Sequence, residues 1–464
     1  MRKPFTLFAA ACWTLVAGGP PLSLYPANPH YFLFRGKPAV LVTSGEHYGA
    51  VLNLDFDGAR YLRTLAKDRL NLTRIFVGNY REGPGMFNIG GNTLAPLPGK
   101  FVSPWKEQDG KFDLTQWNPA FFARLRAFIT EASRRGIIVE VNLFCPMYEE
   151  GMWDLSPMNA KNNVNGIGAV KRTDVLALKD DRLTAVQDDL VRKIVSELRD
   201  FDNIYYEICN EPYFGGVTAE WQRHISRTIA DAEAAFPYRH LISQNIANGS
   251  KKVEDPDPLV SIFNFHYAHP PRAVAQNYGL NKLIGCNETG FDGNSDAIYR
   301  IQGWDFLMAG GALYNNLDYS FTVGHEDGSF AVPPTNPGWG SVAFRKQMGI
   351  LRAFFDRLDL AAVAPAAAIE ANGASARGMD IRGRLAAAYI HRGRAVKDGK
   401  PKFQVDTASR ATELAVNLQA GRYRLEWMDP KTGRRLSRGV ISHPGGEVKL
   451  KSPVFSEDVV LRVL

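Results

Sequence analysis

Cysteine is scarce in this chain of 464 residues, which has only four. Cys12 lies in an apolar stretch at the N-terminus, so Cys145, Cys209 and Cys286 remain as an odd number in the rest of the chain. An odd number implies no disulfide framework, and the spacings match no zinc-binding pattern. The histidines likewise form no pair four residues apart and no triad on one strand. We therefore expect neither a metal site nor a cofactor.

Long apolar runs are absent beyond the N-terminus. Arg2 and Lys3 precede an almost wholly apolar run over residues 5–16, and small residues follow at 17–19. This pattern is typical of a secretory signal, and the run is shorter than the roughly 20 residues that a membrane-spanning helix needs. The sequence predicts a signal peptide over residues 1–19 and a secreted or periplasmic protein with no membrane span after its removal. A retained N-terminal anchor is the alternative.

Acidic residues are too few to balance the basic residues in the C-terminal part of the chain. Residues 365–464 hold 18 Lys and Arg against 10 Asp and Glu, whereas the whole chain has a net charge of +7. The positive charge therefore belongs to this part, and the rest is close to neutral. A basic module can bind nucleic acid, but export argues against that partner. We expect a solvated basic face instead.

Between residues 39 and 360, short apolar runs alternate with amphipathic segments, which is typical of β–α units and a parallel sheet. No G-x-G-x-x-G turn is present, which argues against a doubly wound sheet that binds a dinucleotide. Eight repeats predict an α/β chain with a (β/α)₈ TIM barrel over residues 24–360. The eight runs predicted as strands are Ala39–Ser44, Leu72–Val77, Ile137–Leu143, Ile204–Cys209, Leu241–Gln244, Ser261–Phe265, Leu283–Asn287 and Ala312–Leu317.

The composition changes after the predicted barrel. An alanine-rich segment over residues 361–372 is expected to be a linker. Short β-rich runs separated by turn signals follow, and the stretch Asp-Pro-Lys-Thr-Gly over residues 429–433 predicts a tight turn. Residues 373–464 are therefore predicted to form a small antiparallel β-sandwich.

Two glutamates stand at the ends of two predicted strands. Glu211 follows the fourth strand in Asn-Glu-Pro, and Glu288 follows the seventh in Asn-Glu-Thr-Gly. Barrel enzymes carry their catalytic groups at the C-terminal ends of the strands. Strands four and seven face each other across the barrel, so the two carboxyls can approach to the separation of about 5–5.5 Å typical of retaining glycoside hydrolysis. Either glutamate alone could simply cap a helix, but the pair favours catalysis.

The stretch Ile204–Pro212 resembles the strand-four motif of clan A glycoside hydrolases, in particular glycoside hydrolase family 5, the cellulase and mannanase type. The resemblance implies that Glu211 is the acid/base and Glu288 the nucleophile. It also implies that Asn210 contacts the sugar 2-hydroxyl and that Arg74, on the second strand, supports the nucleophile. A cation beside Glu288 would lower its pKa and keep it ionised.

The sequence departs from this family at two places. The family has a Tyr two residues after its strand-six His, but Ala268 stands two residues after His266. Either a bulge re-aims Tyr267 or the hydroxyl is missing. The usual strand-eight Trp is also absent, and its region holds Tyr314, Asn315, Asn316 and Asp318. We expect His266, Tyr267, His47 and Tyr319 to contact substrate. A buried structural role for His266 and a local cap at His47 are the alternatives.

The stretch Tyr423–Leu464 is similar to the sandwich domain that often follows such barrels and is described as collagen-binding. As a whole, the sequence predicts a retaining O-glycosyl hydrolase that acts on a polysaccharide or oligosaccharide. A carbohydrate-binding barrel without turnover, or a surface adhesion protein whose basic sandwich binds an anionic matrix, is the alternative. The sugar, the linkage, endo or exo action and the oligomeric state do not follow from the sequence.

Overall fold

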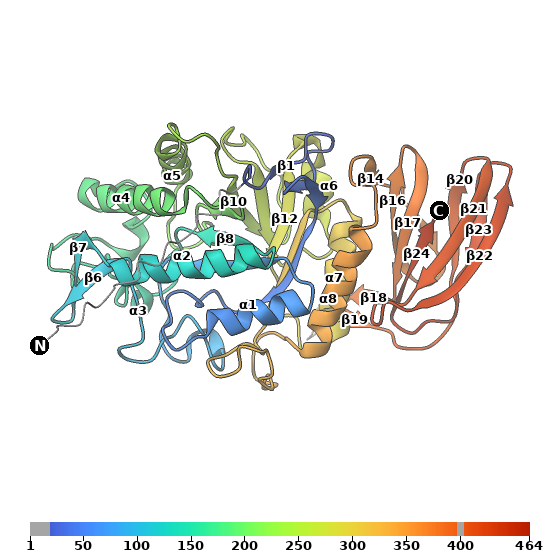
Figure 1. The fold of residues 1–464 in the computed structure, drawn as a ribbon. Helices are drawn as coiled ribbons and strands as arrows, with labels where there is room; N and C mark the ends of the chain where they lie inside the picture. The colour runs from blue at the N-terminus through green and yellow to red at the C-terminus, as the bar shows by residue number, and fades with distance from the viewer. Residues whose placement is uncertain (1–18, 397–402) are drawn as a thin grey trace, which may run out of the picture.

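The computed structural model describes residues 19–396 and 403–464 (Figure 1). The predicted signal peptide, apart from its last residue, lies outside the described residues. Within the described ranges, no helix is both long enough and apolar enough to cross a membrane.

A barrel of eight parallel strands forms the larger part of the chain, and it confirms the predicted (β/α)₈ architecture. The strands run around the barrel in the order β4, β13, β12, β11, β10, β9, β8, β5. Their bounds are β4 (Leu41–Gly45), β5 (Leu72–Phe76), β8 (Ile138–Asn142), β9 (Ile204–Glu207), β10 (Ile242–Asn248), β11 (Ile262–His266), β12 (Leu283–Glu288) and β13 (Leu313–Leu317). All eight match predicted runs, and their residues are buried except at the end of β10.

Asn71 joins the first and second strands where the barrel closes. Its amide oxygen accepts a hydrogen bond of 2.9 Å from the backbone N–H of Val42, and its amide nitrogen donates one of 2.9 Å to the carbonyl of Val40. The side chain thus substitutes for a backbone ladder between β4 and β5. A short sheet of β1 (Ser23–Leu24), β2 (Phe32–Phe34) and β3 (Lys37–Ala39) packs against the N-terminal ends of the barrel strands.

Helices surround the barrel and cover the outer faces of the strands (Figure 1). Asn118 caps α2, where its side chain accepts a hydrogen bond from the N–H of Ala120, as the Asn-Pro pair predicts. The helices are α1 (Gly58–Lys67), α2 (Pro119–Arg134), α3 (Glu150–Trp153), α4 (Asp181–Leu198), α5 (Ala219–Ala232), α6 (Arg272–Asn277), α7 (Asp296–Met308) and α8 (Val342–Phe355). Shorter elements lie in the loops: the hairpin β6 (Trp105–Gln108) and β7 (Lys111–Trp117), and the 3₁₀ turns Met86–Asn88, Arg172–Asp174 and Tyr278–Leu280.

The C-terminal part is an all-β sandwich, as predicted. A six-stranded antiparallel sheet has the order β14, β16, β17, β24, β21, β22, and a three-stranded sheet has the order β15, β20, β23. The bounds are β14 (Val363–Pro365), β15 (Glu370–Ala371), β16 (Ser375–Ile381), β17 (Arg384–His391), β18 (Gly393–Ala395), β19 (Phe403–Val405), β20 (Glu413–Leu418), β21 (Gly421–Met428), β22 (Arg435–His443), β23 (Gly446–Lys451) and β24 (Asp458–Val463). Two of these strands, β14 and β15, lie in the segment expected to be a linker, and β14 pairs with β16.

The sandwich has its own apolar core between the two sheets and packs the outer face of the larger sheet on the barrel. Trp304 of α7 stacks on Tyr389 of β17 with 5.2 Å between ring centroids. Arg300 of α7 pairs with Asp458 of β24 at 2.8 Å, and both side chains are buried. Figure 1 shows α7 and α8 between the barrel and the sandwich. The two parts therefore share a continuous apolar and ionic interface.

Candidate active site

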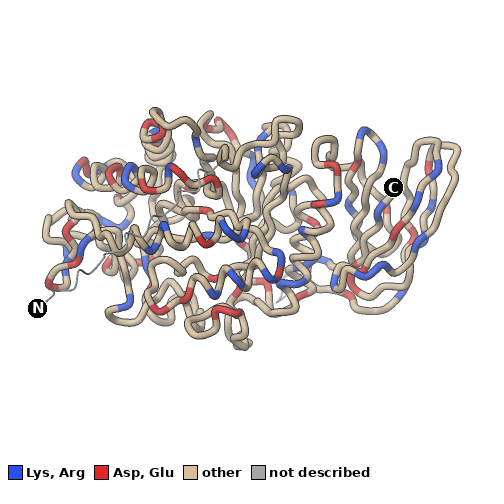
Figure 2. Tube along the Cα trace, viewed as in Figure 1, with Lys and Arg blue, Asp and Glu red and all other residues tan. Residues whose placement is uncertain are grey.

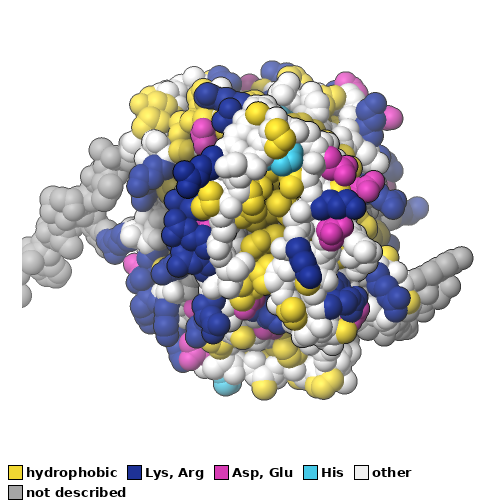
Figure 3. Space-filling model, turned by 90° about the vertical axis from the view of Figure 1, so that its right-hand side faces the viewer, with side chains coloured by type: hydrophobic (Ala, Val, Ile, Leu, Met, Phe, Trp, Pro, Cys, Tyr) yellow, Lys and Arg dark blue, Asp and Glu magenta, His cyan; other side chains and the backbone are white. Residues whose placement is uncertain are grey.

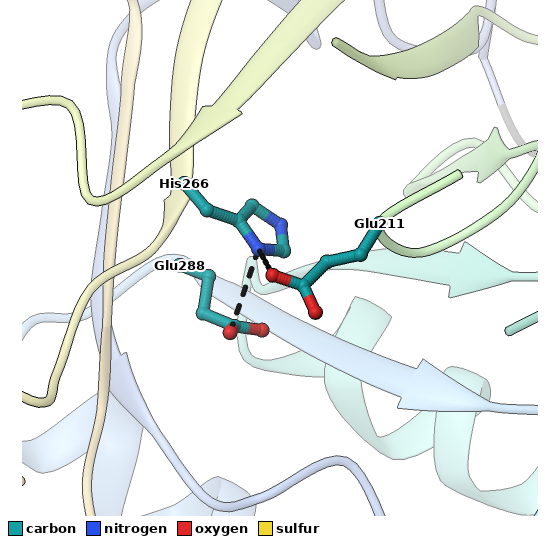
Figure 4. A group of neighbouring side chains, drawn as sticks. All are labelled: Glu211, His266 and Glu288. Carbon is teal, nitrogen blue, oxygen red and sulfur yellow. Dashed lines mark hydrogen bonds and ion pairs between the residues drawn. The ribbon is translucent and has the colours of Figure 1, made fainter. Parts of the chain in front are cut away.

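The two glutamates selected from the sequence meet in one pocket at the C-terminal ends of the barrel strands. Glu288 is the last residue of β12, and Glu211 lies four residues beyond the end of β9. The pocket is small, with a cavity volume of about 70 Å³, and its walls include both glutamates, Asn210, Tyr267, His47, Tyr148 and Glu82. Figure 4 shows Glu211, His266 and Glu288 pointing toward one another.

Glu288 is held as a carboxylate. Tyr267 donates a hydrogen bond of 2.5 Å to its Oε1, and Tyr48 donates one of 2.9 Å to its Oε2. Arg74 Nη1 lies 3.3 Å from Oε2. Burial alone would raise the pKa of Glu288, but the positive charges of His266 and Arg74 and these hydrogen bonds place it well below its ordinary value. The group is therefore ionised at neutral pH.

Glu211 has a different set of partners. Tyr148 donates a hydrogen bond of 2.6 Å to its Oε2, and Tyr213 donates one of 3.2 Å to its Oε1. Its backbone has φ +38°, in the left-handed region that residues with side chains rarely adopt. Strained backbone of this kind persists where surrounding contacts fix it, often at functional sites. The side chain remains about 10% exposed at the pocket.

His266 bridges the two carboxylates. Its Nδ1 lies 3.2 Å from Glu211 Oε1 and 3.4 Å from Glu288 Oε1 (Figure 4). Burial lowers the pKa of His266, but the charge of Glu288 and the hydrogen bonds to both carboxylates outweigh it and raise the pKa to about 9. A protonated imidazole therefore sits between the glutamates. Its buried Nε2 has no hydrogen-bond partner among the described residues.

Arg74 anchors the floor of the site. Besides Glu288, its guanidinium contacts Glu207, Glu140 at 2.6 Å and the side-chain oxygen of Asn210 at 2.8 Å. Burial, together with the charge of Glu207, raises the pKa of Glu140 to about 8. Asn210 also donates a hydrogen bond of 2.7 Å to Tyr148. The arginine thus orients groups on β8, on β9 and the segment that follows it, and on β12 across the barrel.

Tyr267 supplies the hydroxyl whose position was open from the sequence. Its backbone has φ +52°, and the pairing of β11 with β12 shifts register between Phe265 and His266. This irregularity turns Tyr267 into the pocket. Tyr267 follows His266 directly, whereas the family resemblance implies a tyrosine two residues after the histidine. Of the two alternatives, the structure shows the re-aimed tyrosine.

His47 lines another wall of the pocket, and Tyr319 lies beside it, with 6.1 Å between ring centroids. His47 Nε2 is 3.3 Å from Glu82 Oε2, and its buried Nδ1 has no partner within the described residues. The hydroxyl of Tyr319 is also buried and unpaired in the described part of the chain. Unpaired buried polar atoms beside a pocket suit the hydroxyls of a ligand.

Four residues around the two glutamates were not selected from the sequence: Tyr48, Tyr148 and Glu82, which line the pocket, and Tyr213, which contacts Glu211. The three tyrosines donate to the two central glutamates. Tyr48 and Glu82 follow the first and second strands, so the rule that barrel sites lie at strand ends could have identified them. Tyr148 belongs to a longer loop, and no local signal marks it.

One group of side chains in the described residues could offer atoms to a metal ion: Glu211, His266 and Glu288, whose atoms lie within 4.8 Å of one another. His266 Nδ1 is the atom that would have to bind the ion, and it already contacts both carboxylates. Metal binding would require the loss of that proton. The same three atoms are therefore better explained by a proton-mediated bridge.

Several solved structures that this chain resembles are glycoside hydrolases. One is a glycoside hydrolase family 5 protein from Bacteroides vulgatus, 12% identical, with a TM-score of 0.62 over 96% of this chain and 93% of that one. Another is a glycoside hydrolase family 5 mannosidase from Rhizomucor miehei, 12% identical, with a TM-score of 0.50 over 73% of this chain and 99% of that one. The amino-acid sequence matches no family model and no curated protein. At these identities the likeness establishes the fold.

Proposed function

We propose that this chain is a retaining glycoside hydrolase in which Glu288 is the nucleophile and Glu211 the acid/base. The observation that carries the proposal is the spacing of the pair: an oxygen of Glu211 and an oxygen of Glu288 lie within 4.8 Å of each other. Retaining enzymes place the two carboxyls about 5–5.5 Å apart, whereas inverting enzymes leave about 6.5–9.5 Å for a water molecule. The shared fold with glycoside hydrolases supports the same class.

The assignment of roles rests on the two environments. In the first step, ionised Glu288 attacks the anomeric carbon while Glu211 gives its proton to the departing glycosidic oxygen. In the second step, Glu211 takes a proton from water, and the resulting hydroxide displaces Glu288 from the sugar. Arg74, Tyr48 and Tyr267 keep Glu288 ionised, whereas Glu211 faces two tyrosine hydroxyls and the pocket. Glu288 thus has the surroundings of a nucleophile, and Glu211 is the second carboxyl that the mechanism requires.

The substrate-binding residues follow from the same pocket. We propose that Asn210 and His266 contact the sugar beside the nucleophile, and that His47 and Tyr319 offer their unpaired atoms to its other hydroxyls. A mannoside is the first substrate to test, because one structural neighbour is a mannosidase. The remainder of the substrate range is sought with a panel of aryl glycosides and polysaccharides.

Glu288→Ala and Glu211→Ala test the mechanism, with exposed Glu254→Ala as the control. On an aryl glycoside with an acidic phenol, Glu288→Ala should lose nearly all activity. Glu211→Ala should still form the glycosyl-enzyme, which then accumulates because no general base activates water. Azide needs no deprotonation, so it should restore turnover of Glu211→Ala and give a glycosyl azide of retained configuration.

The outcomes separate the alternatives. Rescue of Glu288→Ala with a retained product would reverse the two roles. A wild-type protein that binds oligosaccharides but hydrolyses none of the panel would be a carbohydrate-binding barrel without turnover. Equal activity of all variants would remove this pocket as the catalytic site.

We also propose that the chain is exported to the periplasm or the medium and that its signal peptide ends near residue 19. Mass spectrometry of the exported protein should give an N-terminus close to residue 20. The division into a barrel over 24–360 and a sandwich over 373–464 remains a proposal. Limited proteolysis tests whether residues 361–372 form a flexible linker between the two parts. Because β14 pairs with β16, we expect this segment to resist cleavage.

A further inference from the structure

A groove between the barrel and the sandwich is separate from the active-site pocket and shares no residue with it. It lies where the C-terminal end of α1 and one face of α8 meet β21, β22 and β24. Its volume is about 510 Å³, within the range of ligand pockets. The interface between the two parts of the chain is thus hollowed on one side.

The rim of this groove is strongly basic. Two acidic residues also line it, but Asp68 pairs with Arg345 at 3.2 Å, and Glu426 lies 3.5 Å from Arg424 and 3.8 Å from Arg462. In the described part of the chain, only Arg462 among the six basic residues pairs with a carboxylate. Figure 3 shows Lys and Arg side chains gathered down one side of the sandwich end, and Figure 2 places charges along both parts of the chain. The six basic residues are Lys67, Arg69, Lys346, Arg357, Arg435 and Arg462.

Arg462 is only partly satisfied by its carboxylate partner Glu426. Its side chain is 18% exposed, and its Nε is buried with no hydrogen-bond partner among the described residues. Burial and the positive charges of Arg357 and Arg424 lower its pKa, although Glu426 opposes them. Like charges held this close repel one another, and an anion in the groove would relieve that repulsion.

The floor of the groove is apolar. It is formed by Ile350 and Phe354 of α8 together with Trp427 and Met428 of β21. A sugar ring presents apolar C–H faces and polar edges, so a floor of this kind beneath a cationic rim suits a sugar that carries acidic groups. Phe354 and Trp427 are only 3% and 5% exposed. The partly exposed side chains of Ile350 and Met428 therefore supply most of the apolar surface that a ligand can reach.

We propose that this groove binds a segment of an acidic polysaccharide, with its carboxylate or sulfate groups on the basic rim and its sugar rings on the apolar floor. The groove then holds the chain on an anionic glycan independently of turnover in the barrel. The proposal does not depend on the catalytic roles of Glu211 and Glu288.

Binding is measured by isothermal titration calorimetry with polygalacturonate, a carboxylate polymer, and dextran sulfate, a sulfate polymer. The groove variant Lys346→Gln/Arg357→Gln/Arg435→Gln removes three exposed cations. The control Arg239→Gln/Lys251→Gln/Lys252→Gln removes the same charge from exposed positions outside the groove. We expect about tenfold or greater weakening in the groove variant and little change in the control. Wild-type affinity should fall with added salt, since surface charges are screened.

The two polymers distinguish carboxylate from sulfate as the preferred group, and stronger binding to either supports the proposal. Equal weakening in both variants would show that net charge alone is responsible and would overturn it. So would a lack of binding to both polymers. Tighter binding of a 20-residue oligothymidylate, lost in the groove variant, would mean a nucleic-acid partner instead. Arg435→Gln alone provides a milder change, and thermal unfolding of each variant verifies that it is folded.

Discussion

Tyr267 donates a 2.5 Å hydrogen bond to Oε1 of Glu288, from a backbone position with φ +52°. Removing the hydroxyl in Tyr267→Phe should raise the pKa of Glu288, because the carboxylate loses a donor that favours its charged form. The acidic limb of kcat/KM should therefore move to higher pH. Hydrogen bonds to charged groups contribute about 1.5–3 kcal/mol, so kcat should fall by roughly ten- to a hundredfold.

Tyr213→Phe is the matched control, because Tyr213 donates to Glu211 and not to Glu288. It should leave the acidic limb in place. An unshifted limb in Tyr267→Phe would show that Arg74, His266 and Tyr48 keep Glu288 ionised without the Tyr267 hydroxyl.

His266 gives the protein a pH-dependent stability. Its pKa is raised from an ordinary 6.5 to about 9 in the folded state. A group with a raised pKa contributes its full stabilisation below the unfolded pKa and loses it as the pH rises through the folded pKa. The contribution should therefore be complete below about pH 6.5 and gone above about pH 9.

Urea unfolding at several pH values between 6 and 10 measures this effect. Relative to His266→Gln, the wild type should lose roughly 3 kcal/mol across this window. Substituting the exposed His325 by Gln gives a control that keeps the wild-type slope. A wild type and His266→Gln with parallel curves would mean that His266 is neutral in the folded protein.

Arg74 should matter for stability as much as for catalysis, so Arg74→Met is a poor test of mechanism by itself. It leaves Glu140, Glu207 and Glu288 buried without their shared cation. Loss of one partner from a buried ion pair costs about 3–5 kcal/mol. The free energy of unfolding from chemical denaturation should fall by about that amount.

The variant Arg74→Met/Glu140→Gln/Glu207→Gln replaces the two buried carboxyl groups beside the arginine as well. It should recover part of the stability, while kcat stays low because Glu288 still lacks its cation. Full recovery of kcat together with stability would limit Arg74 to a structural role.

The barrel strands could be predicted because parallel strands covered on both faces are short apolar runs, as in Leu72–Phe76. Glu211 and Glu288 could be selected because barrel sites lie at strand ends. The strand β22 (Arg435–His443) was not predicted, because it is an edge strand with mostly exposed residues and lacks an apolar alternation. The strand β16 (Ser375–Ile381) was not predicted either, because its small and charged residues give no strand signal.

The remaining site residues depend on contacts that no local pattern contains. Tyr148 reaches Glu211 from a loop 63 positions away in the chain. Tyr267 is aimed by a positive φ and a shifted register, neither of which its neighbours in sequence indicate. The alanine-rich segment was expected to be a linker because its side chains are small, but backbone pairing of β14 orders part of it.

The sandwich contacts the loop that carries Tyr267. His269, two residues further on, lies 3.2 Å from Asp305 of α7, and its ring packs edge-on against Phe403 of β19 at 4.7 Å. Asp305 in turn contacts Arg377 of β16 at 2.9 Å and His391 of β17 at 3.5 Å. Burial opposes the charge on Asp305, but these histidines and the arginine hold its pKa well below the ordinary value.

This arrangement predicts that Arg377→Gln/His391→Gln lowers activity although both residues belong to the sandwich. Without its two sandwich partners, Asp305 should hold His269 less firmly, and the hydroxyl of Tyr267 should spend less time on Glu288. We expect a several-fold decrease in kcat and an acidic limb shifted in the direction of Tyr267→Phe. In the Tyr267→Phe background the same double change should have little further effect, because coupled residues are not additive.

The control is Arg384→Gln/Lys449→Gln, which changes two exposed residues elsewhere in the sandwich and should leave kcat unchanged. Equal losses with and without the Tyr267 hydroxyl would show that the contact stabilises the fold without positioning this tyrosine.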